Sequence, residues 1–136
     1  MTVFVLDSSA VLRFLDREAG ADRVGEIFRT CASESASMCI SALQWGEIAG
    51  VERRRFGAQE QERILERLKQ INLLVVPASA ERAVRAANLR VDRKLAYADA
   101  FAIDLAMDST DHVFVTADYD FKAVDELTRI EFLPAK

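Results

Sequence analysis

Short, nearly continuous apolar runs alternate along this chain with segments of helical periodicity. Such runs are typical of strands that helices cover on both faces, because neither face of the strand then meets water. The predicted strands are Thr2–Leu6, Met38–Ile40, Leu73–Val76, Val113–Val115 and Ile130–Leu133. The predicted helices are Ser8–Arg17, Ala21–Ala32, one that begins near Ala42, Gln59–Ile71, Ser79–Lys94 and Tyr97–Met107. This alternation predicts a three-layer α/β/α sandwich around a central parallel sheet of four to five strands.

The length of the chain predicts a single domain over residues 1–136, because 136 residues leave no room for a second domain of ordinary size. Apolar residues make up 51% of it, enough for a substantial core. The opening apolar run, Val3–Leu6, is too short for a signal peptide, and no run approaches the ~20 residues of a membrane span. We therefore expect a soluble cytoplasmic protein without membrane contact, in which Cys31 and Cys39 stay reduced.

The residue inventory excludes several kinds of site. The single histidine, His112, rules out multi-histidine zinc sites and two-histidine acid–base pairs, and two cysteines are too few for structural zinc. The five glycines form neither a dinucleotide-binding nor a phosphate-binding loop motif, so we expect no nucleotide cofactor. His112 is left without a chemical role and is expected to start a strand at the surface.

Charge is unevenly distributed along the chain. Residues 53–94 carry eleven Arg and Lys against five acids, so this segment is net +6 within a chain of net −4. The basic segment could supply phosphate contacts to a nucleic acid. It is equally typical of two solvated helix faces with Glu partners, and charge alone does not decide between the two.

Four acidic residues stand where a merely soluble protein rarely places them. Asp7 and Asp118 follow predicted strands, at the edge where parallel sheets bind ligands. Glu47 falls within an apolar helical stripe, and Asp99 opens an almost wholly apolar helix. Each has an ordinary alternative, such as a cap, a turn or a helix-dipole contact. Taken together they predict a site of oxygen donors for a hard ion, Mg²⁺ or Mn²⁺, because burying unpaired anions is costly.

At these residues the sequence resembles the PIN domain family, and most closely its VapC-type toxins from bacterial toxin–antitoxin pairs. The resemblance covers essentially the whole chain and rests on four segments in order: VLDSSAVL (5–12), ISALQWGEI (40–48), YADAFAIDLA (97–106) and VFVTADYDF (113–121). It implies a divalent-metal-dependent endoribonuclease that inhibits translation and growth. The implied acidic quartet, both catalytic and metal-binding, is Asp7, Glu47, Asp99 and Asp118, with supporting roles for Ser8, Ser9, Thr116 and Asp120.

The resemblance also implies partners and products. The expected partners are an RNA substrate, a cognate antitoxin protein and a second copy of the chain in a homodimer. The implied hydrolysis leaves a 3′-hydroxyl and a 5′-phosphate and needs neither histidine nor the 2′-hydroxyl. The alternative is a non-catalytic PIN-like module that binds RNA or protein. A receiver domain fits poorly, because it needs an acceptor Asp at the end of a middle strand, whereas the third strand here ends in Val76-Pro77. A haloacid-dehalogenase-like phosphatase fits poorly, because Asp7 lacks a second Asp two residues on.

Several other residues carry weaker predictions. Trp45 is expected in the core rather than at a partner-binding surface, and Gln44 is placed to complete a capping box with Ser41. Asp16 is expected on the solvent face of the first helix. Tyr119 and Phe121 flank Asp118 and either stack on a base or pack the loop.

Overall fold

Every strand pair in the central sheet is parallel. The computed structural model describes residues 1–136 and contains five strands, in the order β3-β2-β1-β4-β5. The strands are β1 (Val3–Leu6), β2 (Ser37–Ser41), β3 (Leu74–Val76), β4 (His112–Thr116) and β5 (Arg129–Phe132). The predicted sheet is confirmed. The strand order reverses beside β1, since β2 and β3 extend it on one side and β4 and β5 on the other.

Successive residues of the inner strands point into two different cores. On β1, Phe4 and Leu6 pack into one apolar cluster and Val5 into the other. On β4, Val113 and Val115 again lie opposite Phe114. Side chains alternate between the faces of a strand, so a continuous apolar run supplies both cores at once.

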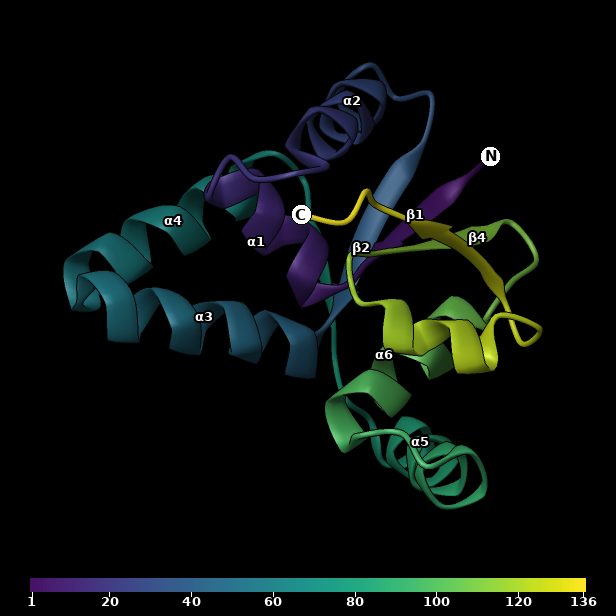
Figure 1. Cartoon of the computed structure of the whole chain (residues 1–136). Coiled ribbons are helices and arrows are strands. Elements are labelled where there is room, and N and C mark those ends of the chain that lie inside the picture. The colour runs from purple at the N-terminus through teal and green to yellow at the C-terminus, as the bar shows by residue number, and fades with distance from the viewer.

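Helices form the two outer layers of the sandwich (Figure 1). One layer contains α1 (Ser8–Leu15), α2 (Ala21–Ala32), α3 (Ala42–Phe56) and α4 (Ala58–Gln70). The other contains α5 (Ala80–Arg93), α6 (Tyr97–Ala106) and η1, a 3₁₀-helix over Tyr119–Val124 that the sequence pattern did not predict. None of these helices combines the length and the apolar composition that a membrane crossing requires.

The α3–α4 hairpin turns at a glycine. Gly57 has a φ of +87°, a left-handed conformation that residues with a side chain rarely adopt. This turn lets α4 fold back beside α3, so that Ile48 of α3 and Leu68 of α4 reach the same core. The hairpin extends to the left in Figure 1.

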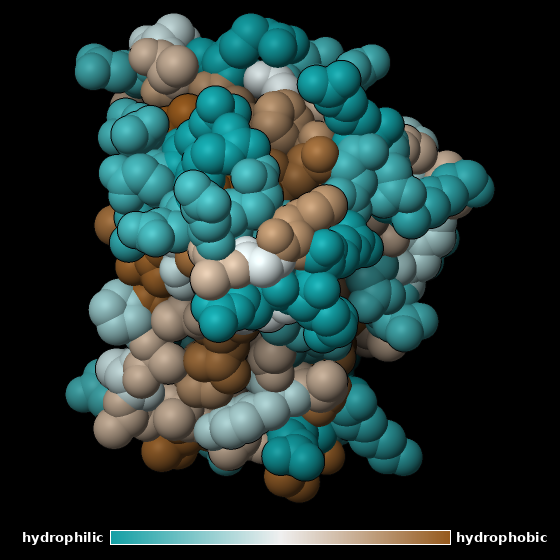
Figure 2. Space-filling model, turned by 90° about the vertical axis from the view of Figure 1, so that its left-hand side faces the viewer, coloured by the Kyte–Doolittle hydropathy of each residue, from teal (hydrophilic) through white to brown (hydrophobic).

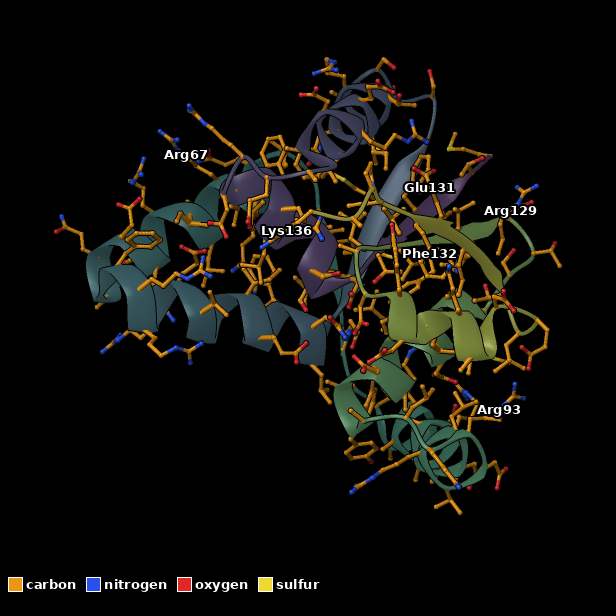
Figure 3. The ribbon with its side chains drawn as sticks, viewed as in Figure 1. Arg67, Arg93, Arg129, Glu131, Phe132 and Lys136 are labelled. Carbon is orange, nitrogen blue, oxygen red and sulfur yellow. The ribbon has the colours of Figure 1, made fainter.

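The basic segment 53–94 is spread over the molecule instead of forming one patch. Figure 3 shows Arg67 on α4 and Arg93 on α5 at opposite sides. Five of its eleven basic residues form ion pairs with acids, namely Arg55, Arg63, Arg82, Arg85 and Arg93. The structure therefore favours solvated helix faces with acidic partners for much of this segment.

Candidate acidic site at the carboxyl edge of the sheet

Asp7 lies at the centre of the site. It directly follows the central strand β1, next to the position where the strand order reverses, which is where open α/β sheets bind ligands. Its side chain is only 3% exposed. Its Oδ2 accepts hydrogen bonds from the hydroxyls of Ser9, at 2.5 Å, and Thr116, at 2.7 Å. Asp7 is thus a buried carboxylate held in one orientation by two hydroxyl donors.

The same two hydroxyls tie the loop after β4 to Asp7. The backbone N–H of Ala117 donates to Ser9 Oγ at 2.9 Å, and that of Asp118 donates to Thr116 Oγ1, also at 2.9 Å. Ser9 and Thr116 therefore connect two segments that are more than a hundred residues apart in sequence. They position the Asp118 backbone relative to the Asp7 carboxyl.

Gln44 lies in the site, and its predicted role in a capping box is wrong. Its side chain is fully buried, and it bonds to α1 and α6 instead of capping its own helix. The Ser8 N–H donates to its Oε1 at 2.7 Å, while its Nε2 donates to the Ala98 carbonyl at 3.3 Å and to Asp99 Oδ1 at 3.4 Å. The predicted capping box is wrong in this half; Ser41 does cap α3, accepting from Leu43 N–H.

Glu47 is exposed, which corrects the prediction of a carboxylate within a buried stripe. The buried residues of α3 are Gln44, Ile48 and Glu52, spaced four apart. Glu47 lies one residue before Ile48, about 100° around the helix axis from that line. Its Oε1 accepts from Ser8 Oγ at 3.1 Å, so the carboxylate faces the start of α1 beside the site.

The remaining acids lie near the start of α6, in the case of Asp99, and after the end of β4, in the case of Asp118 and Asp120. Asp99 lies half-buried in the first turn of α6, as predicted. Asp118 is half-buried and also caps η1, because its Oδ1 accepts from the Asp120 N–H at 2.9 Å. Asp118 is therefore a helix cap, the ordinary alternative for this residue, and it also lies beside the site. Asp120 is exposed.

Burial and mutual repulsion together raise the pKa values of two of these carboxylates, Asp7 and Asp99. Burial raises the pKa of Asp7 from 3.8 to about 7, and the charges of Asp99 and Glu47 add to the rise, while the Ser9 and Thr116 hydrogen bonds oppose it. Burial likewise raises the pKa of Asp99 to about 6, with further repulsion from Glu47, Asp118 and Asp120. Asp99 and Glu47 thus lie near enough to act on Asp7, and Glu47, Asp118 and Asp120 lie near enough to act on Asp99, as expected of converging carboxylates.

No basic side chain compensates this cluster. Nine ion pairs are formed in the chain, and none includes Asp7, Glu47, Asp99, Asp118 or Asp120. Uncompensated carboxylate oxygens are the donor set that a hard divalent cation prefers. As the side chains stand, no three acidic, His or Cys groups converge closely enough to hold one ion. The chemistry of these donors fits a hard cation.

The hydrogen bonds from Ser9 and Thr116 to Asp7 lead to a testable prediction about the pKa of Asp7. In the Ser9→Ala variant we expect the pKa of Asp7 to rise above about 7, because a hydrogen bond that favours the ionised form is lost. Ser8→Ala is the matched control, since Ser8 Oγ bonds to Glu47 and not to Asp7. Carboxyl-carbon NMR titration of both variants checks this. An unchanged pKa in Ser9→Ala would contradict the assigned role of the hydroxyl.

The two aromatic residues that follow Asp118 have different surroundings. Phe121 is buried and packs edge-on against Phe114, while Tyr119 stays 40% exposed and donates its hydroxyl to the Leu133 carbonyl. Loop packing is therefore the role of Phe121. Trp45 packs against the core as expected, and His112 begins β4.

The predicted position of Asp16 is wrong, and the two cysteines are unpaired. Asp16 is not on a free solvent face, because it ends α1 and pairs with Arg55 of α3 at 2.8 Å. Cys39 is buried and Cys31 half-buried, and both are free thiols.

The fold and site together define a class: a parallel α/β/α sandwich with an acidic cluster at the position where the strand order reverses. Comparison with known proteins gives the family. The PIN domain profile matches residues 4–127, so the chain belongs to the PIN domain family. This membership removes the receiver and phosphatase alternatives.

Solved structures share the fold at low sequence identity. DNA-bound VapBC from Salmonella typhimurium is 18% identical with a TM-score of 0.72, over 97% of this chain and 98% of that one. VapBC2 from Rickettsia felis, bound to a promoter fragment, is 17% identical with a TM-score of 0.74, over 98% and 100%. VapC20 from Mycobacterium tuberculosis, a toxin that cleaves the sarcin–ricin loop, is 20% identical with a TM-score of 0.69, over 98% and 100%. No curated protein matches the sequence.

Proposed function

We propose that this chain is a divalent-metal-dependent endoribonuclease, the VapC-type toxin of a toxin–antitoxin pair, formed by a single nuclease domain over residues 1–136. The observation that carries the proposal is the cluster of mutually repelling carboxylates at the carboxyl edge of the sheet, which no basic side chain compensates. Membership of the PIN domain family and likeness in fold to solved VapC proteins support it.

Hydrolysis of a phosphodiester needs a nucleophilic water and relief of the charge that develops on the phosphate. A divalent ion, Mg²⁺ or Mn²⁺, supplies both effects when bound, because it acidifies water and neutralises oxyanions. In our proposal Asp7, Asp99 and Asp118 hold the ion, directly or through water. Burial and the hydrogen bonds from Ser9 and Thr116 hold the Asp7 carboxylate in place before any substrate binds.

The other polar residues are assigned supporting roles. Glu47 is exposed and only one of its oxygens is bonded within the chain, so it can orient the attacking water or help to hold a second ion. Gln44 positions Asp99, and Ser9 and Thr116 position Asp7. Asp120 adds negative charge at the mouth of the site.

The partners of the proposed toxin follow from the same family. We propose a cognate antitoxin as its protein partner and a homodimer as its assembly. The solved VapBC relatives are themselves toxin–antitoxin complexes bound to DNA. RNA is the proposed substrate of this chain.

Incubation of the purified protein with total RNA tests the activity. With Mg²⁺ or Mn²⁺ we expect discrete cuts that end in a 3′-hydroxyl and a 5′-phosphate, because water is the nucleophile and the 2′-hydroxyl takes no part. With chelator we expect no cuts. Mapping the cut ends by adaptor ligation separates these products from cyclic phosphates. RNA that is bound but never cut with either ion would favour the alternative, a non-catalytic PIN-like binding module.

A further inference from the structure

Tyr119 is an aromatic residue that stays exposed beside the acidic site. It directly follows Asp118, and 40% of its surface is exposed. Phe121, two residues further on, points inward and fills the core, whereas the Tyr119 ring remains at the surface. A tyrosine in such a position presents a large, rigid apolar face to any ligand that reaches the site.

Hydrogen bonds connect Tyr119 to the centre of the site through the end of β5. The Tyr119 hydroxyl donates to the Leu133 carbonyl at 2.7 Å, and the Leu133 N–H donates to the Thr116 carbonyl at 2.8 Å. The Thr116 hydroxyl donates in turn to the Asp7 carboxylate. The Tyr119 ring therefore lies at the same carboxyl edge of the sheet as the acidic cluster.

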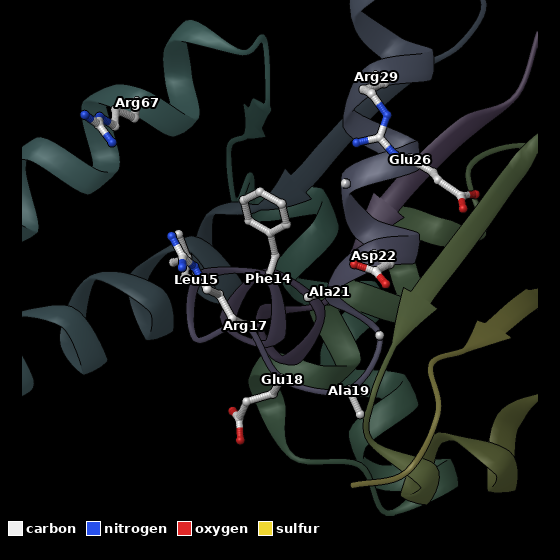
Figure 4. Close-up of a pocket in the computed structure, with 12 residues that line it drawn as sticks. Phe14, Leu15, Arg17, Glu18, Ala19, Ala21, Asp22, Glu26, Arg29 and Arg67 are labelled. Carbon is white, nitrogen blue, oxygen red and sulfur yellow. The ribbon is translucent and has the colours of Figure 1, made fainter.

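Leu133, to which the Tyr119 hydroxyl is bonded, is itself firmly held. It is buried against Gly20, which has a φ of +91° and leaves no room for a Cβ beside the Leu133 side chain. Arg13 donates to the carbonyls of Ala19 and Pro134, the chain neighbours of Gly20 and Leu133. Figure 4 shows Ala19 on the loop between α1 and α2. The ring is thus held in place before a ligand arrives, which lowers the entropic cost of binding.

Lys122 adds an unpaired positive charge to this ring. Its ammonium lies 5.1 Å from the centroid of the Tyr119 ring and 5.9 Å from that of Phe132. The two rings meet edge-on, and Figure 3 labels Phe132 on β5. Lys122 is exposed and forms no ion pair, although Asp120 is only two residues away. It is also the only Lys or Arg within residues 95–128.

An aromatic ring beside an unpaired cation suits a nucleotide. Bases of single-stranded nucleic acids stack on aromatic side chains, and ammonium groups pair with their phosphates. A cation on an exposed ring is held more weakly than a stacked base, so a base can displace the Lys122 ammonium from the Tyr119 ring. The flexible lysine side chain then lets the ammonium reach a phosphate close by.

We propose that Tyr119 and Lys122 form a platform for the substrate RNA, on which an unpaired base near the cut phosphate stacks on the Tyr119 ring while Lys122 pairs with a neighbouring phosphate. The inference rests on the proposed function, since it takes RNA as the ligand of the acidic site. It assigns RNA contacts to two residues outside the acidic quartet. Both are substrate-binding residues and neither takes part in the chemistry.

Removal of the bases from an RNA tests the stacking with the full chain. Fluorescence anisotropy measures the affinity for a short oligo(U), in which every binding register offers the same base, and for a chain of equal length without bases. Ca²⁺ replaces Mg²⁺, because it takes the same oxygen ligands in a looser geometry, and gel electrophoresis verifies that the RNA stays intact. We expect the parent to prefer oligo(U) by about fivefold or more.

Replacement of the ring should remove this preference. Tyr119→Leu should bind both chains with similar affinity, while Tyr119→Phe, which keeps the ring, should retain most of the preference. Tyr97→Leu is the matched control, because Tyr97 is 38% exposed and has Arg90 over its ring, yet lies about 200° around α6 from Asp99. It should behave like the parent. No preference in the parent, or an undiminished preference in Tyr119→Leu, would overturn the proposal.

The salt dependence of binding tests the phosphate contact of Lys122. Lys122→Gln should weaken binding of both chains by a similar factor and lower the slope of log affinity against log salt by about 0.7. Lys69→Gln is the control, since Lys69 is exposed without an ion pair on α4, on the hairpin side that carries many hydrophilic side chains in Figure 2. It should leave the slope unchanged. An unchanged slope in Lys122→Gln would overturn the assignment.

These measurements record binding and not cleavage, so failure of the platform is distinguishable from failure of the nuclease. RNA that is cut in Mg²⁺, without any preference for bases that depends on Tyr119, would overturn the platform and leave the nuclease. That preference without cuts in Mg²⁺ or Mn²⁺ would support the platform and refute the nuclease.

Discussion

The Asp99→Asn variant is expected to lose RNA cleavage by about a hundredfold or more while keeping its fold. Replacing a partner of a metal ligand typically costs ~10–100-fold, so replacing a ligand itself should cost at least as much. The change swaps an anionic oxygen donor for a neutral one of the same shape, and the Gln44 amide can still donate to the remaining carbonyl oxygen. Asp7→Asn should behave in the same way. Initial rates of cleavage in Mg²⁺, with circular dichroism as a check of folding, measure the effect.

Asp92→Asn is the matched control for these variants. Asp92 is an exposed carboxylate near the end of α5 with no ion pair, so its loss removes the same charge from a helix that carries no site residue. We expect it to cleave like the parent. Parent-like cleavage by both Asp7→Asn and Asp99→Asn would show that the acidic cluster is not the catalytic site.

Asp7→Asn is expected to melt at a higher temperature than the parent when both are measured in chelator above pH 7. The pKa of Asp7 is about 7 in the folded protein and near 3.8 when unfolded, so between these values the folded state holds a proton that the unfolded state has lost. The stability of the parent therefore falls as the pH rises from about 4 to 7. Asn carries no charge to bury and should lack most of this fall. Thermal melts at several pH values compare the two proteins directly.

Added Mn²⁺ should reverse the order of the two proteins. An ion that binds only the folded site stabilises by about 2.7 kcal/mol at a hundred times its dissociation constant. For a domain of this size the melting temperature should rise by about 5–15 °C in the parent and by much less in Asp7→Asn. Asp92→Asn should keep the full rise. Asp16→Asn is a poor control because it also breaks the pair with Arg55. An equal rise in the parent and Asp7→Asn would place the ion elsewhere.

Much of the fold was readable from local pattern. A short apolar run such as Val113–Val115 identifies a buried strand, and a longer apolar segment such as Tyr97–Ala106 identifies a buried helix. Both signals come from the segment itself, so they can be recognised without knowing which elements pack against it. The 3₁₀-helix Tyr119–Val124 was missed because a helix of six residues is too short to show a periodicity. Its cap, Asp118, was predicted as a residue that follows a strand, with a cap or turn as the ordinary alternative.

The candidate site was readable where chain position alone determines location. Asp7 follows the central strand and Asp99 opens a buried helix, and parallel topology brings such strand and helix ends to one edge of the sheet. That topology also explains why Ser9 and Thr116 meet at Asp7 from opposite ends of the chain. The proximity of these residues was predictable, but their hydrogen-bond partners were not.

The sequence by itself determined the strands, the helices and the acids at the sheet edge, because backbone periodicity and chain order encode them. Only the tertiary structure decided the rotation of α3 about its axis. Leu43, Glu47 and Val51 formed the more apolar-looking stripe, yet Gln44 and Glu52 are buried with Ile48, and Glu47 is exposed. The packing of α1, α4 and α6 around α3 sets that rotation. A helix buries the face that its neighbours cover, even when a carboxylate such as Glu52 lies on it.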